Sequence, residues 1–393
     1  MLLPTDVSQT TQTHLEQLVS DKTQEGPHLE FKRDFPARWD EKAKHELLAD
    51  VTAFANAGGG DLIFGIEEDG QGQALSISPQ MIVNWDEEIR RLQDILMHSV
   101  EAHMPGVKFH PVPVSVGGKT GYSLVIRVPQ SWAGPHRVKT NQHFYVREGL
   151  RKRQLDIPEI RSLFLQSESQ SQRVRDFRTE RIGKILVGEA PHRLVDGPLL
   201  VVHLIPTQAT RGLVQIDPVP YMNHRDLPIM GTRSGRARLN IDGALSVRTE
   251  QSNGETHGYS QFFRNGFFES TFVLTNRFNQ GHIILHSGFY EKYLIALLDN
   301  FRSELKLLNL DPECAILVSL TRANETQLGV LDHWDTLESR QFDRNILILP
   351  DVVARSDVVS SQALRPVFDL MCQAAGLAGS RNFNAAGEWV PPG

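Results

Sequence analysis

The spacing of hydrophobic residues predicts alternating strands and helices in the first part of the chain. In segment 28–33, Leu29 and Phe31 alternate with polar residues at the two-residue period of a half-buried strand. Segment 41–57 repeats apolar residues at steps of three and four, which is the period of an amphipathic helix. The glycine run 58–60 then predicts the end of that helix.

The same patterns predict mixed α+β architecture along the rest of the chain. Before residue 167 we expect strands at 62–66, 107–116, 122–128 and 143–147, a helix at 85–102, and a helix that begins at 157. Beyond Gly197 we expect strands at 199–205, 244–247, 261–268, 271–274, 315–320 and 346–349, and a helix at 289–307. We find no internal repeat.

These elements divide into two predicted domains. A polar N-terminal segment (1–22) precedes a first α+β domain at 23–166. A polar, helix-compatible linker (167–190) leads to a second domain of mixed α and β elements at 191–373, whose role the sequence does not indicate, and 374–393 is expected to be a tail.

Composition narrows the class of protein. Of 393 residues, 40% are hydrophobic and 22% are charged, as in a soluble globular protein. No apolar run approaches the roughly 20 residues that a membrane helix needs. The N-terminus lacks a basic start followed by an apolar stretch, so we expect a cytoplasmic protein. The two cysteines are too few and too far apart for a thiolate zinc site.

Carboxylates cluster around the first two predicted strands. Glu25 precedes the first predicted strand. Glu30 lies on that strand, with Lys32 on the same face. Glu68 and Asp69 come at the end of the next predicted strand. If the two strands are neighbours, these acids meet at one edge of the sheet. Converging carboxylates repel one another unless they hold a cation such as Mg²⁺ or Mn²⁺. The alternative, on spacing alone, is that they are solvated turn residues.

Several motifs together resemble the Schlafen AlbA-type domain, over about residues 20–165. They are, in order, E-G-P-H-L-E-F-K at 25–32, T-A-F-A-N at 52–56, the glycine pair 59–60, F-G-I followed by E-E-D-G at 64–70, and H-F-Y-V-R at 143–147. Bacterial proteins with this domain have also been described as DNA-binding or divergent ATP-binding. Residues 191–393 resemble no family that we can name.

The resemblance implies a metal-dependent endoribonuclease that acts on RNA, tRNA in particular. Carried over by position, it implies that Glu25, Glu30 and Glu68 hold Mg²⁺ or Mn²⁺, with Lys32 as a supporting cation. The third acid is Glu here, where the nucleases commonly have Asp. A shift of one residue would give that role to Asp69.

Basic residues concentrate after the fourth predicted strand. Between Arg137 and Arg181 there are eleven basic and six acidic residues, in a chain of net charge −6. Such a local excess is typical of a phosphate-binding surface, and the alternative is an ordinary solvated helix face. We expect nucleic acid to contact Arg137, Lys139, Tyr145, Arg147, Arg151, Lys152 and Arg153, with Tyr145 and Trp132 available for base stacking.

Other motifs predict no chemistry. The V-G-G-K-T sequence at 116–120 is similar to the end of a phosphate-binding loop, but Pro113 stands where the required glycine would be. We therefore expect a hairpin turn there and no ATP. His282 and His286 lack an acidic partner nearby, so packing is favoured over metal binding.

The sequence thus supports three hypotheses. The first is a bacterial Schlafen-like endoribonuclease, in stress or phage defence. The second is a non-catalytic DNA- or RNA-binding regulatory module, with structural carboxylates. The third is an interaction scaffold of a defence complex, which leaves open a homo-oligomer or a partner protein.

Overall fold

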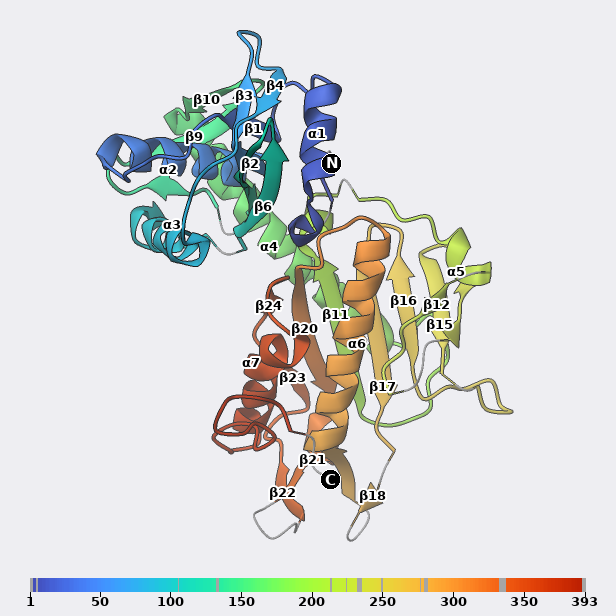
Figure 1. Ribbon diagram of the computed structural model, residues 1–393. Helices are drawn as coiled ribbons and strands as arrows, with labels where there is room; N and C mark the ends of the chain where they lie inside the picture. The colour runs from blue at the N-terminus through green and yellow to red at the C-terminus, as the bar shows by residue number, and fades with distance from the viewer. Residues whose placement is uncertain are drawn as a thin grey trace. The chain divides into compact units, whose positions relative to one another are not determined.

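The chain forms two compact units, Met1–Ser171 and Gln172–Gly393 (Figure 1). The structure is a computed structural model and describes residues 3–4, 6–104, 106–131, 134–212, 214–223, 225–231, 235–248, 250–275, 277–278, 282–331 and 337–390. Helices and mixed sheets occur in both units, which confirms the α+β class. Among the described residues, no helix has the length and apolar character needed to cross a bilayer.

The described part of the N-terminal unit contains ten strands, three complete α-helices and the first part of a fourth. The helices are α1 (Gln12–Ser20), α2 (Glu41–Asn56) and α3 (Trp85–Ser99), followed by the first part of α4 (Ile157–Leu186). The strands are β1 (Leu29–Lys32), β2 (Gly60–Phe64), β3 (Ile66–Glu68), β4 (Ala74–Ile77), β5 (Val100–Glu101), β6 (Lys108–Val116), β7 (Lys119–Val128), β8 (Arg137–Val138), β9 (His143–Glu148) and β10 (Arg151–Gln154). They form sheets of order β1-β2-β7-β6 and β10-β9-β8-β5, and the pair β3-β4.

The central sheet of this unit is buried on both faces. Strand β2 alternates, so that Leu62 packs in one cluster with α2 and α3, while Ile63 packs in another with Leu15 and Leu18 of α1. The segment 1–22, predicted to be polar, therefore covers one face of the sheet with the apolar side chains of α1. Helix α2 starts where the Asp40 carboxylate accepts a hydrogen bond from the Ala43 amide at 2.8 Å.

The expected hairpin at 117–120 is confirmed. Strands β6 and β7 are antiparallel, with Val116 opposite Lys119. Gly117 and Gly118 have φ of +59° and +78°, which a two-residue turn of this kind requires at both positions. The segment therefore does not open a helix as a phosphate-binding loop would.

The C-terminal unit contains a large, mostly antiparallel sheet. Its further helices are α5 (Val219–Asn223), α6 (Ser287–Leu307) and α7 (Ser360–Ala374). Its strands are β11 (Leu199–Pro206), β12 (Asp226–Leu227), β13 (Gly235–Arg236), β14 (Arg238–Leu239), β15 (Gly243–Val247), β16 (Tyr259–Phe263), β17 (Phe268–Val273), β18 (Arg277–Phe278), β19 (His282–His286), β20 (Cys314–Thr321), β21 (Thr326–Leu331), β22 (Leu337–Gln341), β23 (Ile346–Ile348) and β24 (Val352–Ala354). The main sheet has the order β14-β15-β16-β17-β11-β20-β23, with β24 also paired to β20.

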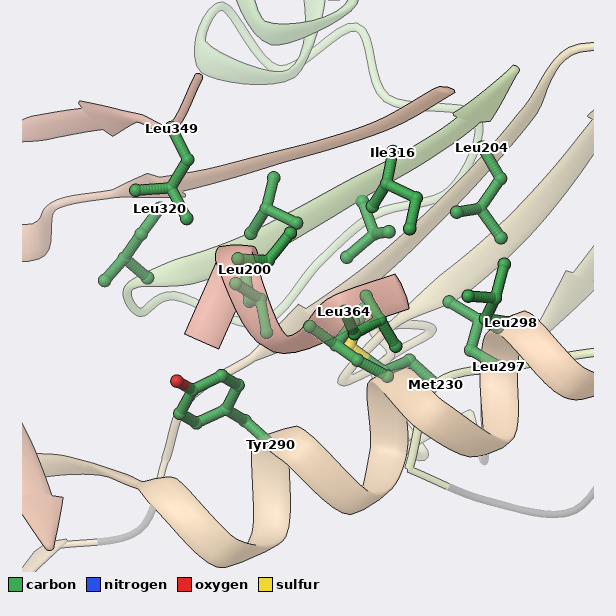
Figure 2. Packing of buried hydrophobic residues seen from close by; sticks show 14 of the residues in the cluster. Leu200, Leu204, Met230, Tyr290, Leu297, Leu298, Ile316, Leu320, Leu349 and Leu364 are labelled. Carbon is green, nitrogen blue, oxygen red and sulfur yellow. The ribbon is translucent and has the colours of Figure 1, made fainter. Parts of the chain in front are cut away.

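One face of this sheet carries the core of the unit. Figure 2 shows Tyr290 and Leu297 of α6 and Leu364 of α7 packed toward sheet residues such as Leu200 and Ile316. The strand predicted at 261–268 is wrong in its extent, because the chain turns between β16 and β17. Gly266, at φ +85°, provides the left-handed conformation for that turn.

The segments predicted as a helix-compatible linker and as a tail are both ordered parts of the fold. The linker predicted at 167–190 lies mostly in the continuous helix α4. The tail predicted from 374 onward is bound to α6: the Ser380 hydroxyl, the Asn382 amide and the Trp389 indole donate to the buried Glu291 carboxylate, at 2.7, 2.9 and 2.8 Å.

Candidate functional site

Strands β1, β9 and β10 and helix α2 bring charged side chains together in the N-terminal unit. Glu30 and Lys32 lie two residues apart on β1, so they share a face of the strand. Glu46 and Asp50 lie one turn apart on α2. Arg147 of β9 and Lys152 of β10 are directly paired in the antiparallel ladder.

Glu30 is held between two cations. Its Oε1 atom lies 2.5 Å from Lys32 Nζ, and its Oε2 atom lies 2.5 Å from Arg147 Nη2. Arg147 is itself buried and donates further bonds to the carbonyls of Gly26 and Leu29. Burial alone would raise the pKa of Glu30, but Lys32 and Arg147 together hold it below its usual value. Glu30 is therefore ionised and fully paired.

Asp50 joins two lysines from distant strands. Its Oδ1 atom lies 2.8 Å from Lys152 Nζ and its Oδ2 atom lies 3.6 Å from Lys32 Nζ. Burial raises the pKa of Asp50, and the two lysines oppose that rise. Burial would lower the pKa of Lys32, but the surrounding carboxylates, Asp50 first, raise it above its usual value. Both lysines, which we call the lysine pair, remain partly exposed.

Glu25 and Glu68 approach each other at the β3–β4 hairpin. The Oε2 atoms of both lie within 3.7 Å of the point that a Cβ atom on Gly72 would occupy. The two Oε2 atoms are therefore no farther apart than the sum of their distances to that point. Burial, with help from the nearby Glu30 and Glu68 carboxylates, raises the pKa of Glu25 to about 7. The Phe31 amide, which donates to Glu25 Oε1 at 2.7 Å, opposes this rise.

Asp69 has a local structural role in the same hairpin. Its Oδ1 atom accepts hydrogen bonds from the amides of Gln71 and Gln73, at 2.7 and 3.0 Å. These bonds lower the pKa of Asp69. They also close the turn that precedes β4, as Asx turns commonly do. Between the two candidates for a third acid, Glu68 is the one whose carboxylate faces Glu25.

The predicted set of three metal-binding carboxylates does not fit a metal as arranged. Both oxygens of Glu30 are engaged by cations, which leaves only Glu25 and Glu68 facing a common point. Within the described ranges, no group of three or more His, Cys, Asp or Glu side chains has a geometry suited to a metal ion. Glu30 therefore holds the basic side chains in place.

The predicted basic surface is divided by the alternation of β10. Lys152 points toward α2, whereas Arg151 and Arg153 occupy the opposite face of the strand. Arg153 forms ion pairs with Glu148 and Glu159. Arg151 is exposed, and the described part of the chain offers it no carboxylate within ion-pair distance. Arg151 is thus the uncompensated cation on that face.

The remaining predicted contacts differ in their surroundings where the structure describes them. Arg137 pairs with Glu101 at 2.5 Å, and the exposed Lys139 donates to the His98 carbonyl at 3.0 Å. Tyr145 was predicted to stack on bases, but it is a buried core residue whose hydroxyl accepts from the Asn141 amide. Arg147, also predicted as a contact, is internal. Trp132 lies outside the described residues.

Sequence reasoning missed Asp50 and Glu46. The prediction of this helix rested on the spacing of its apolar residues alone. The signal that could have found Asp50 is its position within the apolar run of α2, where an acid needs a cationic partner.

Comparisons with known proteins find a matching family and similar solved structures. Residues 25–156 match the family model described as "Schlafen, AlbA_2". No curated protein matches the chain. Among solved structures, the DIP2311 protein from Corynebacterium diphtheriae is 20% identical, with 36% of this chain and 26% of that chain covered and a TM-score of 0.25. The N-terminal domain of a putative ATP-dependent DNA helicase RecG-related protein from Nitrosomonas europaea is 25% identical. The match covers 30% of this chain and 71% of that chain, with a TM-score of 0.21. The chain thus spans about a quarter of the first of these structures.

Proposed function

Because residues 25–156 form a Schlafen AlbA_2 domain, we propose that this protein binds nucleic acid through that domain. The family match favours nucleic-acid binding over a purely structural role. The lysine pair is the observation that supports the proposal most directly. Two strands far apart in sequence place Lys32 and Lys152 on one buried carboxylate, with their side chains partly exposed. Fixed, partly exposed ammonium groups suit phosphate oxygens.

Binding of RNA and DNA by the full chain, measured by fluorescence anisotropy over a series of KCl concentrations, tests this proposal. We expect the logarithm of the affinity to fall linearly with the logarithm of salt, because bound phosphates release counterions. Lys152→Gln should weaken binding and reduce the salt slope. Arg344→Gln is a suitable control, since Arg344 is exposed in the C-terminal unit and pairs with Asp343. The absence of binding to any RNA or DNA at low salt would refute the proposal.

A second candidate is cleavage of RNA, tRNA in particular, that depends on Mg²⁺ or Mn²⁺. The approach of Glu25 and Glu68 favours it, because two carboxylates facing one point attract a hard cation. Simple binding ranks above cleavage, since the ion pairs of Glu30 remove one of the three acids on which the nuclease hypothesis depends.

Incubation of the protein with tRNA, single-stranded RNA and DNA, in Mn²⁺ or in EDTA, distinguishes these two functions. Cleavage should need the metal and should be lost in Glu25→Gln and in Glu68→Gln. It should persist in Asp69→Asn, because the Asp69 carboxylate is engaged in the turn. Tight binding without any metal-dependent fragments would support the binding module alone.

A further inference from the structure

Lys32 contacts three carboxylates that differ in exposure. Its Nζ atom lies 2.5 Å from Glu30, 3.4 Å from Glu46 and 3.6 Å from Asp50. The side chains of Glu30 and Asp50 are 11% and 1% exposed, whereas that of Glu46 is 51% exposed. Of the acids that the described residues bring to Lys32, only Glu46 is therefore open to solvent.

This difference determines which carboxylate can leave Lys32. Removing a buried partner leaves a desolvated charge unpaired, which is strongly unfavourable. An exposed ion pair is worth little, and its members exchange readily with water and ions. Glu46 can rotate into solvent, whereas Glu30 and Asp50 stay fixed by Arg147 and Lys152.

Glu46 also lies beside the second lysine. Lys152 Nζ is 3.5 Å from the Glu46 carbonyl, and both members of the lysine pair contact the same Asp50 carboxylate. An anion that replaced the Glu46 carboxylate on Lys32 would therefore also be close to Lys152. Three cations (Arg147, Lys32 and Lys152) exceed the two buried acids by one charge, and Glu46 offsets that excess.

We infer that the Glu46 carboxylate occupies, on Lys32, the place of a nucleic-acid phosphate and is displaced when nucleic acid binds. This inference rests on the proposed function and adds to it the position of one phosphate subsite, on the α2 side of the lysine pair. Glu46 thereby acts as an internal competitor that weakens binding, and it releases Lys32 only to a ligand that supplies a replacement anion.

The variant Glu46→Gln tests the inference, with Glu41→Gln as a matched control. Glu41 is an exposed acid on the same helix that pairs with Lys44 and not with Lys32. We expect Glu46→Gln to tighten binding of single-stranded RNA about three- to fivefold at low salt, as expected for loss of an exposed competing charge. It should also steepen the salt slope, because the displaced carboxylate no longer takes up a cation. Glu41→Gln should change both quantities much less.

A double-mutant cycle shows whether the effect passes through Lys32. In a Lys32→Met background, Glu46→Gln should lose its effect on affinity. Thermal unfolding of each variant identifies any that fails to fold, and in that case the salt slope of the single variant still decides. Equal effects of Glu46→Gln and Glu41→Gln, with the wild-type protein still binding RNA, would overturn the inference but leave the proposed function intact. No binding by any variant would overturn both.

Discussion

Arg147 and Glu30 form a buried ion pair, with Nη2 and Oε2 separated by 2.5 Å and the Arg147 side chain 1% exposed. The pair connects β9 with β1, which belong to different sheets of the N-terminal unit. Arg147 was predicted to contact nucleic acid and Glu30 to hold metal. Their pairing gives both residues a part in the stability of the domain.

We expect Glu30→Gln to destabilise the N-terminal unit by about 3–5 kcal/mol, because it leaves the buried Arg147 without its anion. Urea denaturation followed by fluorescence measures this change. The low pKa of Glu30 adds a pH dependence: its stabilisation is present above the unfolded value and is lost as the pH falls through the folded value. If Glu30→Gln were as stable as the wild-type protein, the structural role would be refuted.

Glu25 should titrate near pH 7 in the folded protein. Since its folded pKa lies above the unfolded value, its contribution makes the protein less stable as the pH rises from about 4.5 to 7. NMR with ¹³C-labelled glutamate measures the midpoint. Glu68→Gln should lower that midpoint, because the Glu68 charge disfavours ionisation of Glu25, whereas Asp69→Asn should leave it nearly unchanged. A Glu25 midpoint near 4.5 would contradict the burial of Glu25, and a midpoint that Glu68→Gln left unchanged would contradict the close approach of the two carboxylates.

Arg151→Gln should weaken nucleic-acid binding more than Arg153→Gln. The two residues share a face of β10, but Arg153 is already paired with Glu148 and Glu159. Loss of one phosphate contact should reduce the salt slope by about one unit for duplex DNA. Anisotropy at several salt concentrations measures both quantities. Equal losses for the two variants would show that the acids do not compensate Arg153.

Glu269 is the centre of a buried network in the C-terminal unit. It accepts hydrogen bonds from Arg181, His203 and Tyr259, at 2.7–2.9 Å. Glu269→Gln should cost about 3–5 kcal/mol, since Arg181 would be left buried and unpaired. Arg181→Met combined with Glu269→Gln should recover part of that loss. Calorimetry measures both variants, and additive losses would refute the coupling.

Because the pKa of Glu269 is lowered, this network stabilises the fold over a wide range of pH. Burial would raise that pKa, but His203 and Arg181 lower it to about 2. The stabilisation is therefore complete above the unfolded value of about 4.5 and is lost only as the pH approaches 2.

Local hydrophobic patterns predicted the strands and helices well, but they did not predict which side chains pair with one another. Period-two and period-3.6 patterns predicted β1 and α2 from the spacing of their apolar residues, although most of β1 and the second half of α2 are buried on all sides, and the motif order predicted the Schlafen-type domain. The pairing of Asp50 with Lys152 joins residues about a hundred positions apart, and no local pattern indicates it. Tyr145 was misassigned for a related reason: its position on a basic strand suggested a surface role, while the packing of β9 against α2 buries it.

The hydrogen bonds from residues 380–389 to Glu291 limit where a shortened protein can end. Three uncharged donors satisfy a carboxylate whose burial raises its pKa, and the described residues provide it with no cation. A chain cut before Ser380 would keep the carboxylate but lose all three donors. Expression of the C-terminal unit alone should therefore extend through Trp389, even though this stretch contains no helix.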